Sequence, residues 1–178
     1  MWNEIHSTLE KGQDLSSAQI RWAMNQILIG AAADDEVAKF LLGLKAKGET
    51  VDEVSALVDE MYIHANLIDV KERAVDPVGT GGDGFDTINI STAAAIVTTA
   101  AGARVVKHGN RAATSKSGAA DVLEALGVNI NLGPEGVAQC VHKIGIGFAL
   151  APKFHPAMRF AAPVRKSLGV PTDRKSHV

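Results

Sequence analysis

The sequence has a single cysteine, few aromatic residues and no long apolar run, and each shortage excludes a class of protein. The single cysteine, Cys140, excludes a disulfide within the chain, which is typical of a reducing cytoplasm. Aromatic residues make up 4% of the chain and the basic residues are scattered, a poor pattern for nucleic-acid binding. The longest apolar runs fall far short of the about 20 residues that cross a bilayer. The N-terminus lacks the basic and apolar regions of a signal peptide. We therefore expect a cytoplasmic protein that binds neither nucleic acid nor membranes.

The composition favours a folded chain that binds an anion. Apolar residues make up 46% of the 178 residues and charged residues 21%, which suits one ordinary domain, or a small helical lobe joined to part of a larger domain. Residues 1–106 hold 8 Lys/Arg and 16 Asp/Glu, whereas residues 107–178 hold 10 and 4. A basic second half suits an anionic small molecule, although a chance imbalance on solvated faces is an alternative for its outer lysines.

The first 70 residues are predicted to form helices only. Capping boxes begin two of them, where Ser16 precedes Gln19 and where Thr50 precedes Glu53. Apolar residues recur at helical spacing behind both boxes and behind the acidic run at 34–36. We therefore predict a small all-helical domain of three or four helices over residues 1–70.

From Val75 onward the pattern alternates between strands and helices. Predicted strands cover Val75–Val78, Arg104–Lys107, Val128–Asn131 and Gly147–Leu150. Predicted helices cover Ser91–Ala101, Gly118–Leu126 with Ser117 as its cap, Pro134–Lys143 and Pro156–Leu168, and glycines at 102, 127, 145 and 169 end them. This alternation predicts a parallel-sheet α/β domain over residues 71–178. Ligands of such sheets bind at the carboxyl ends of the strands.

The stretch at 75–92 has the features of a phosphate site. Glycines at 79, 81, 82 and 84 follow the first predicted strand, with Asp83 among them. Glycines let the backbone approach a ligand, and the N–H groups that open the next helix attract an anion. The dinucleotide fingerprint is excluded because the helix does not begin at the third glycine and Arg104 stands where an acid should hold the ribose. The Walker pattern is excluded because no Lys-Ser/Thr pair follows the glycines.

Five motifs in one order resemble those of anthranilate phosphoribosyltransferases. They are Gly-Thr-Gly-Gly-Asp from residue 79, Asn-Ile-Ser-Thr-Ala-Ala-Ala from 89, Lys-His-Gly-Asn-Arg from 107, His-Pro-Ala-Met-Arg from 155 and Pro-Val-Arg from 163. The resemblance implies transfer of the phosphoribosyl group from phosphoribosyl pyrophosphate to anthranilate, a step of tryptophan biosynthesis. It also implies Mg²⁺ on the leaving pyrophosphate and a homodimer formed through the helical domain.

The resemblance also assigns roles to residues. Phosphoribosyl pyrophosphate would be bound by Gly79, Gly82, Asp83, Thr87, Asn89, Ile90, Ser91, Thr92, Lys107, His108, Gly109, Asn110, Arg111, Ala112, Ala113, Thr114, Ser115 and Ala119. Anthranilate would be bound by Gly79, Asn110 and Arg165, whose planar guanidinium suits a carboxylate. Ser91 would also ligate Mg²⁺, although Ser91 and Thr92 could be simple helix caps. The catalytic residue stays unassigned; His108 is the candidate, but it could also line the acceptor's site or brace its loop.

Two departures from the family's pattern bear on activity. Thr114 replaces a common serine and keeps its hydroxyl, whereas Ala119 replaces a serine and loses one hydrogen bond, worth about 0.5–1.5 kcal/mol. After Thr172 the family continues into a long second half that carries an Asp-Glu pair for a second Mg²⁺ and the remaining strands, and this sequence does not follow that pattern. We therefore expect a chain that is incomplete relative to the family and has no useful rate by itself.

Two other functions stay open. A pyrimidine nucleoside phosphorylase also joins a helical lobe to an α/β domain with a glycine-rich phosphate site, although the motif at 107–111 and Arg165 match the anthranilate enzyme better. The other alternative is a catalytically incomplete remnant that dimerises and binds ligands without turning them over.

Overall fold

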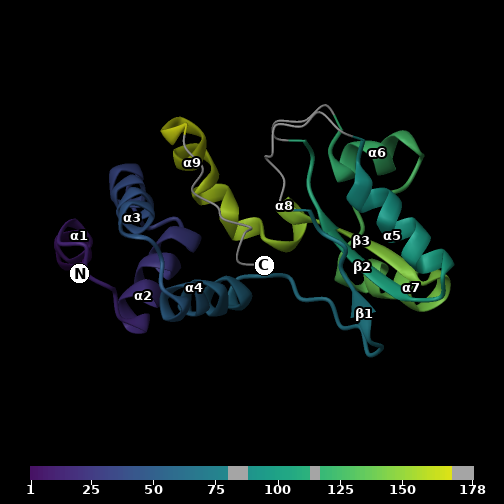
Figure 1. Cartoon of the computed structure of the whole chain (residues 1–178), viewed down its shortest axis with the longest axis horizontal. Helices are drawn as coiled ribbons and strands as arrows, with labels where there is room; N and C mark the ends of the chain where they lie inside the picture. The colour runs from purple at the N-terminus through teal and green to yellow at the C-terminus, as the bar shows by residue number, and fades with distance from the viewer. Residues whose placement is uncertain (80–87, 113–116, 170–178) are drawn as a thin grey trace. The chain divides into compact units, whose positions relative to one another are not determined.

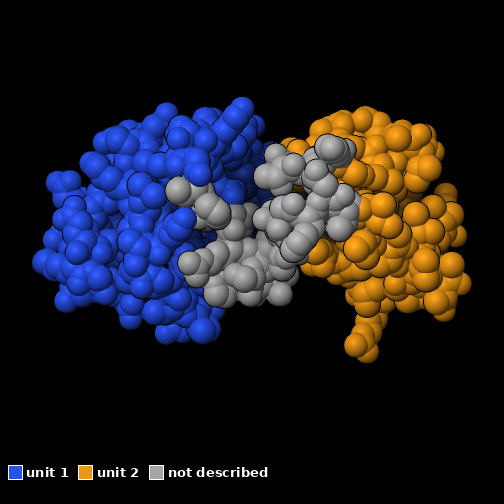
Figure 2. All heavy atoms as spheres, turned by 45° about the horizontal axis from the view of Figure 1, so that its top comes forward, with its two compact units in different colours: residues 1–65, 155–174 blue, residues 66–154, 175–178 orange. Residues whose placement is uncertain are grey.

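The computed structural model describes residues 1–79, 88–112 and 117–169, which form two compact units. The first unit contains residues 1–65 together with the described residues that follow position 154, and the second contains the described residues between 66 and 154 (Figure 2). The chain therefore enters the second unit and then returns to the first. The predicted boundary at residue 70 lies close to the first crossing, but the sequence pattern did not predict the return.

A helical bundle makes up the first unit. Its N-terminal helices are α1 (Trp2–Glu10), α2 (Ser17–Leu28), α3 (Asp34–Lys47) and α4 (Val51–Ile63) (Figure 1). Their apolar faces meet around the fully buried side chains of Ile5, Ile20 and Phe40. The 3-10 helix η1 (Pro156–Phe160) and helix α9 (Ala162–Leu168) pack on this bundle, and Ala161 and Val164 belong to the same core. The predicted helical domain is confirmed.

Both predicted capping boxes are present. Ser16 Oγ accepts from the N–H of Gln19 at 3.3 Å, and Gln19 Oε1 accepts from the N–H of Ser16 at 2.9 Å. Thr50 and Glu53 exchange the equivalent bonds at 3.3 and 2.8 Å. Each box satisfies N–H groups that have no partner within the helix, so local sequence sets where α2 and α4 begin.

The carboxylate of Glu53 also joins three segments of the bundle. Glu53 is fully buried, and it accepts from the N–H of Leu15 at 2.8 Å and from Lys47 Nζ at 2.7 Å. Burial alone would raise the pKa of Glu53, but the hydrogen bonds from Lys47, Leu15 and Thr50 outweigh it and hold that pKa below its ordinary value. The loop before α2, the end of α3 and the start of α4 therefore meet at one ionised group.

A three-stranded parallel sheet is the centre of the described part of the second unit (Figure 1). Strand β2 (Arg104–Gly109) lies between β1 (Ala74–Val75) and β3 (Ile146–Leu150). The helices of this unit are α5 (Ile90–Ala100), α6 (Ala119–Ala125), α7 (Pro134–Ile144) and α8 (Ala151–Phe154). The predicted parallel α/β domain is confirmed, with β1 shorter than predicted.

Side chains of β3 separate two small cores. Phe148 packs with Ala120 and Leu123 of α6, whereas Ala149 packs with Val137 of α7. Because successive strand residues face opposite sides, α6 and α7 cover opposite faces of the sheet. The parallel strands share one carboxyl edge, and the predicted ligand residues at 79 and 107–111 lie at or beyond it.

The predicted strand Val128–Asn131 is wrong. The segment is a turn in which the side chain of Asn129 accepts from the N–H of Asn131 at 3.0 Å, while Ile130 is buried in the α6 core. An asparagine side chain that binds nearby backbone competes with strand pairing. Ile130 is therefore an apolar core residue that lies in a turn rather than in a strand.

Two further predictions are also wrong, one of an uninterrupted helix and one of a helix cap. The predicted helix Pro156–Leu168 is interrupted at Ala161, because Pro163 has no N–H to continue a helix and instead lies in the first turn of α9. Ser117 does not cap α6; Gly118 is the N-cap residue, and its N–H donates to the side chain of Asp121 at 3.1 Å.

The predicted helix ends are confirmed. The glycines predicted to end helices, Gly102, Gly127, Gly145 and Gly169, all have positive φ. Within the described ranges, no helix combines the length and apolar character that crossing a bilayer requires.

Candidate functional site

A buried lysine marks the carboxyl edge of the sheet. Lys107 lies near the end of β2 and is only 3% exposed. Its Nζ donates to the carbonyl oxygen of Pro77, which follows β1, at 3.0 Å and to Ser91 Oγ at 3.1 Å. An ammonium held at the carboxyl edge of the sheet, beside a helix N-terminus, suits the oxygens of an anion.

The start of α5 lies beside this lysine. Asn89 is the N-cap residue, and its Oδ1 accepts from the N–H of Thr92 at 2.9 Å and from Ser91 Oγ at 3.2 Å. The cap is therefore Asn89 rather than Ser91 or Thr92. Thr92 is buried, and its Oγ1 has no hydrogen-bond partner within the described part of the chain.

A continuous polar network links four segments of the second unit. It runs from Pro77 through Lys107, Ser91 and Asn89, and Asn89 Nδ2 then donates to the carbonyl oxygen of Ser117 at 3.1 Å. The structure thus brings together Asn89, Ser91 and Lys107, which the resemblance assigned to one ligand. The N-terminus of α5 adds a partial positive charge at the same place.

Asp76 lies beside the candidate site, at the carboxyl edge of the sheet, and the sequence analysis did not identify it. It follows β1 directly, and its Oδ1 accepts from the N–H of His108 at 3.1 Å. The bond ties the end of β1 to the end of β2, next to Lys107. An acid between a strand and the glycines was a signal that could have found it.

Arg111 is held by acidic residues of α6. Its Nη1 donates to Asp121 at 3.0 Å and to Glu124 at 2.8 Å. The hydrogen bond and charge of Glu124, followed by those of Asp121, raise the pKa of Arg111, so it stays fully charged. The backbone N–H of Ala112 also donates to Asp121, at 2.9 Å.

Some of the remaining predicted residues lie in the described part of the chain, and the others lie outside it. Gly109 has no room for a side chain, since a Cβ there would lie 2.8 Å from the Phe148 ring and 3.0 Å from Ala119 Cβ. Ala119 is buried in the α6 core, whereas Ile90 and Asn110 are exposed. Gly82, Asp83, Thr87, Ala113, Thr114 and Ser115 lie outside the described residues. Their roles stay predictions.

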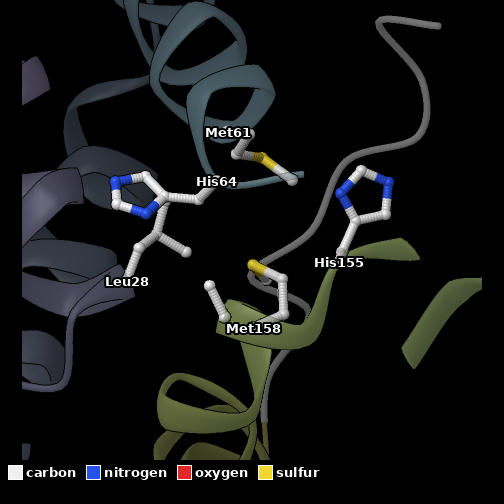
Figure 3. Close-up of a pocket in the computed structure, with 6 residues that line it drawn as sticks. Leu28, Met61, His64, His155 and Met158 are labelled. Carbon is white, nitrogen blue, oxygen red and sulfur yellow. The ribbon is translucent and has the colours of Figure 1, made fainter. Parts of the chain in front are cut away.

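Arg165 lies in α9 and so belongs to the first unit, whereas Asn110 and Gly79 belong to the second. The first unit also has a hollow lined by Leu28, Met61, His64, His155, Ala157 and Met158 (Figure 3). The hollow is too narrow for a water molecule, and burial lowers the pKa of His155. His64 Nε2 donates to Asn25 Oδ1 at 2.9 Å, so these groups pack the bundle and do not form a ligand pocket.

The described residues offer Mg²⁺ few ligands. No group of three or more His, Cys, Asp or Glu side chains within residues 1–79, 88–112 and 117–169 could hold a metal ion. Ser91 Oγ has a suitable oxygen, but the Lys107 ammonium lies 3.1 Å from it. A second cation fits beside Lys107 only when anionic oxygens lie between the two charges.

Comparison with known families also divides the chain in two, but the second match includes residues 155–169, which the structure places in the helical unit. Residues 3–65 match the helical bundle domain of a glycosyl transferase family, and residues 71–174 match the a/b domain of the glycosyl transferase family. The two matches together span most of the sequence.

Curated relatives and solved structures are similar over nearly the whole chain. Anthranilate phosphoribosyltransferases from Rhodococcus jostii and Salinispora arenicola are 55% and 54% identical, each over 96% of this chain. These matches cover 47% and 50% of the relatives, so the chain spans about half their length.

The crystal structure of the enzyme from Thermus thermophilus is 41% identical with a TM-score of 0.87, over 94% of this chain and 51% of that one. The Saccharomyces cerevisiae enzyme in complex with PRPP and Mg is 30% identical with a TM-score of 0.85, over 96% and 52%.

Proposed function

The chain belongs to the glycosyl transferase family in both its helical bundle domain and its a/b domain, and we propose that it carries the phosphoribosyl pyrophosphate site of an anthranilate phosphoribosyltransferase. In that reaction the amine of anthranilate forms a bond with C1 of the ribose. The bond from C1 to the pyrophosphate oxygen breaks, pyrophosphate leaves with the electron pair, and the amine loses a proton.

The observation that carries the proposal is the buried ammonium of Lys107 against Ser91 Oγ at the start of α5. The leaving pyrophosphate gains negative charge as its bond to C1 breaks. A fixed ammonium and the N–H groups of a helix N-terminus stabilise such charge without reorganising. Asn89 holds Ser91 and caps the helix, so these donors are already oriented before the substrate binds.

Magnesium enters this proposal with the substrate. Mg²⁺ would neutralise part of the charge of the leaving pyrophosphate. Ser91 Oγ would be its ligand from this chain, with Lys107 on the other side of the phosphate oxygens. The yeast relative is a complex with PRPP and Mg, which supports this role.

Titration calorimetry with phosphoribosyl pyrophosphate and MgCl₂ tests the assignment. We expect the chain to bind, and Lys107→Met to weaken binding at least about tenfold, since a charge-assisted hydrogen bond is lost. Lys143→Met removes an exposed lysine of α7 and is the matched control, with affinity expected within about twofold. An affinity for phosphoribosyl pyrophosphate that is unchanged in Lys107→Met contradicts the proposal. So does a chain that binds thymidine and phosphate but not phosphoribosyl pyrophosphate.

Arg165 is proposed to bind the carboxylate of anthranilate through its planar guanidinium. The 4-fluoroanthranilate complex of a yeast variant supports a site for this class of ligand in the family. Arg165→Ala should weaken anthranilate and leave phosphoribosyl pyrophosphate binding nearly unchanged. The opposite pattern in calorimetry would remove Arg165 from this role.

Turnover is proposed to need more polypeptide than this sequence contains, because the chain spans about half the length of its relatives. Removing one comparable electrostatic contact costs about 10²–10³ in rate, and the remaining half would supply more than one. We expect little product from the chain with both substrates and Mg²⁺, and a large gain when a polypeptide equivalent to the remaining half of a relative is added. Full turnover by the chain alone would refute this part.

A further inference from the structure

The carboxylate of Asp121 in the second unit binds the backbone at positions 112 and 118, on either side of residues that were predicted to bind phosphoribosyl pyrophosphate. Asp121 Oδ2 accepts from the N–H of Ala112 at 2.9 Å and from the N–H of Gly118 at 3.1 Å, and Oδ1 accepts from Arg111 at 3.0 Å. Positions 112 and 118 are six residues apart in sequence, yet they meet at a single oxygen. We call these four groups the Asp121 clasp.

The backbone around the clasp is packed too closely for any side chain at position 118. A Cβ on Gly118 would lie 2.1 Å from the nitrogen of Ala112 and 2.5 Å from Asp121 Oδ2. Contacts this short do not occur in real structures, so the approach of the Arg111–Ala112 backbone to α6 depends on glycine. The sequence thus provides both the acceptor and the space for it.

The clasp is also joined to the polar network at the carboxyl edge. Ser117 precedes Gly118, and its carbonyl oxygen accepts from Asn89 Nδ2, while Asn89 in turn holds Ser91 beside Lys107. On the other side, Asn110 O accepts from the N–H of Ala120 at 3.1 Å in the first turn of α6. The segment is therefore fixed to α6 at one end and to both α6 and α5 at the other.

We infer that Asp121 is a positioning residue, which holds Arg111 and the backbone N–H of Ala112 in place for the phosphates of phosphoribosyl pyrophosphate. This inference rests on the proposed function for its ligand, but not for its geometry. Asp121 does not touch the substrate itself. It acts by fixing Arg111, whose guanidinium it shares with Glu124.

The charge around Asp121 fits this role. The hydrogen bond from the N–H of Ala112, together with those from Arg111 and Gly118, holds the pKa of Asp121 below its ordinary value despite partial desolvation. Glu124 is the other charged group at Arg111, and its own pKa is also lowered, chiefly by the hydrogen bond from Arg111. The carboxylate is therefore ionised at neutral pH, when it binds N–H donors most strongly.

The test uses the full chain and two readouts, amide hydrogen exchange followed by NMR and calorimetry with phosphoribosyl pyrophosphate and MgCl₂. In Asp121→Ala we expect exchange at Ala112 and Gly118 to rise about tenfold or more, with β3 amides unchanged, and ligand affinity to fall about tenfold. Asp121→Asn keeps an acceptor oxygen and should recover part of both. The amide shifts of Ala112 and Gly118 should titrate with the lowered pKa of Asp121 in the unaltered chain and lose that titration in Asp121→Asn.

Three further variants separate the causes. Glu124→Gln removes the second partner of Arg111 and should leave the amide signature of the clasp intact. Glu135→Gln removes an acid from the first turn of α7 and should change neither readout. Gly118→Ala should reproduce Asp121→Ala through the crowded Cβ.

The inference is overturned if the amides of Ala112 and Gly118 exchange no faster in Asp121→Ala than in the unaltered chain. It is also overturned if Asp121→Ala and Glu135→Gln lose affinity for phosphoribosyl pyrophosphate equally. If the unaltered chain binds no phosphoribosyl pyrophosphate, the proposed function fails and the ligand part of the inference fails with it. The amide readout still decides whether the clasp exists, so the two failures are distinguishable.

Discussion

Glu53 is the residue on which three segments of the helical unit converge. Glu53→Gln keeps the shape but removes the charge that faces Lys47 and the N–H of Leu15. Hydrogen bonds to a charged group are worth about 1.5–3 kcal/mol, so we expect a loss of that size in the free energy of unfolding. Urea denaturation measures it. Asp52→Asn, at an exposed acid of the same helix turn, is the control and should change stability by less than about 0.5 kcal/mol.

The same carboxylate predicts how stability depends on pH. The pKa of Glu53 is lower in the folded chain than in the unfolded one, where it is about 4.3. Its contribution is therefore fully present above the unfolded pKa and is lost as pH falls through the folded pKa. The stability gap between the unaltered chain and Glu53→Gln should be constant near neutral pH and shrink below about pH 4. A gap that grows on acidification would contradict this assignment.

Helix α7 and strand β3 show how closely one element can approach another. A Cβ on Gly147 of β3 would lie 2.7 Å from Val137 Cγ1 and 2.8 Å from Val137 O. Gly147→Ala should therefore lower the free energy of unfolding by about 1–3 kcal/mol through overpacking. Gly136→Ala on α7 is the contrast, because its Cβ would lie 3.3 Å from Leu132 Cβ, a much less crowded position than that at Gly147, and alanine is the better helix former. Denaturation curves that shift in the same direction for both variants would argue against the close approach.

Elements with strong local signals could be predicted from sequence. The capping boxes at Ser16 and Thr50 predicted where α2 and α4 begin, and the uncharged run of α5 predicted both its ends to within a residue. The turn at 128–131 could not be predicted, because an asparagine side chain decided it against an apolar pattern. The return of residues 155–169 to the first unit depends on contacts distant in sequence.

The candidate site divides in the same way. The family resemblance assigned Lys107 and Ser91 to one ligand, and in the structure Lys107 Nζ donates to Ser91 Oγ at 3.1 Å. Asp121 was missed because sequence does not show which acids accept backbone N–H groups, whereas Asp76 was missed although its place between a strand and the glycines was a signal.

At the scale of the whole molecule, helix α4 has an apolar face that the described residues of the helical unit do not cover. Val51, Val58 and Tyr62 lie on one face of the helix and are 82%, 43% and 63% exposed. We propose that this face belongs to the interface of a homodimer formed through the helical unit. Light scattering at tens of micromolar should give twice the mass of the chain. Val58→Lys with Tyr62→Lys should give a monomer, whereas Glu10→Lys on α1 should not; a folded monomer before any substitution would end the proposal.

Because the chain returns to its first unit, a single backbone cut between the units should not separate the two fragments. Lys71 is 84% exposed and lies between α4 and β1, so trypsin should cut there first under native conditions. The cut leaves α1–α4 on one fragment and α9 on the other, yet Ala161 and Val164 still fill the core of the helical unit. The two fragments should therefore elute together in gel filtration and separate only in denaturant, as a nicked but undivided protein.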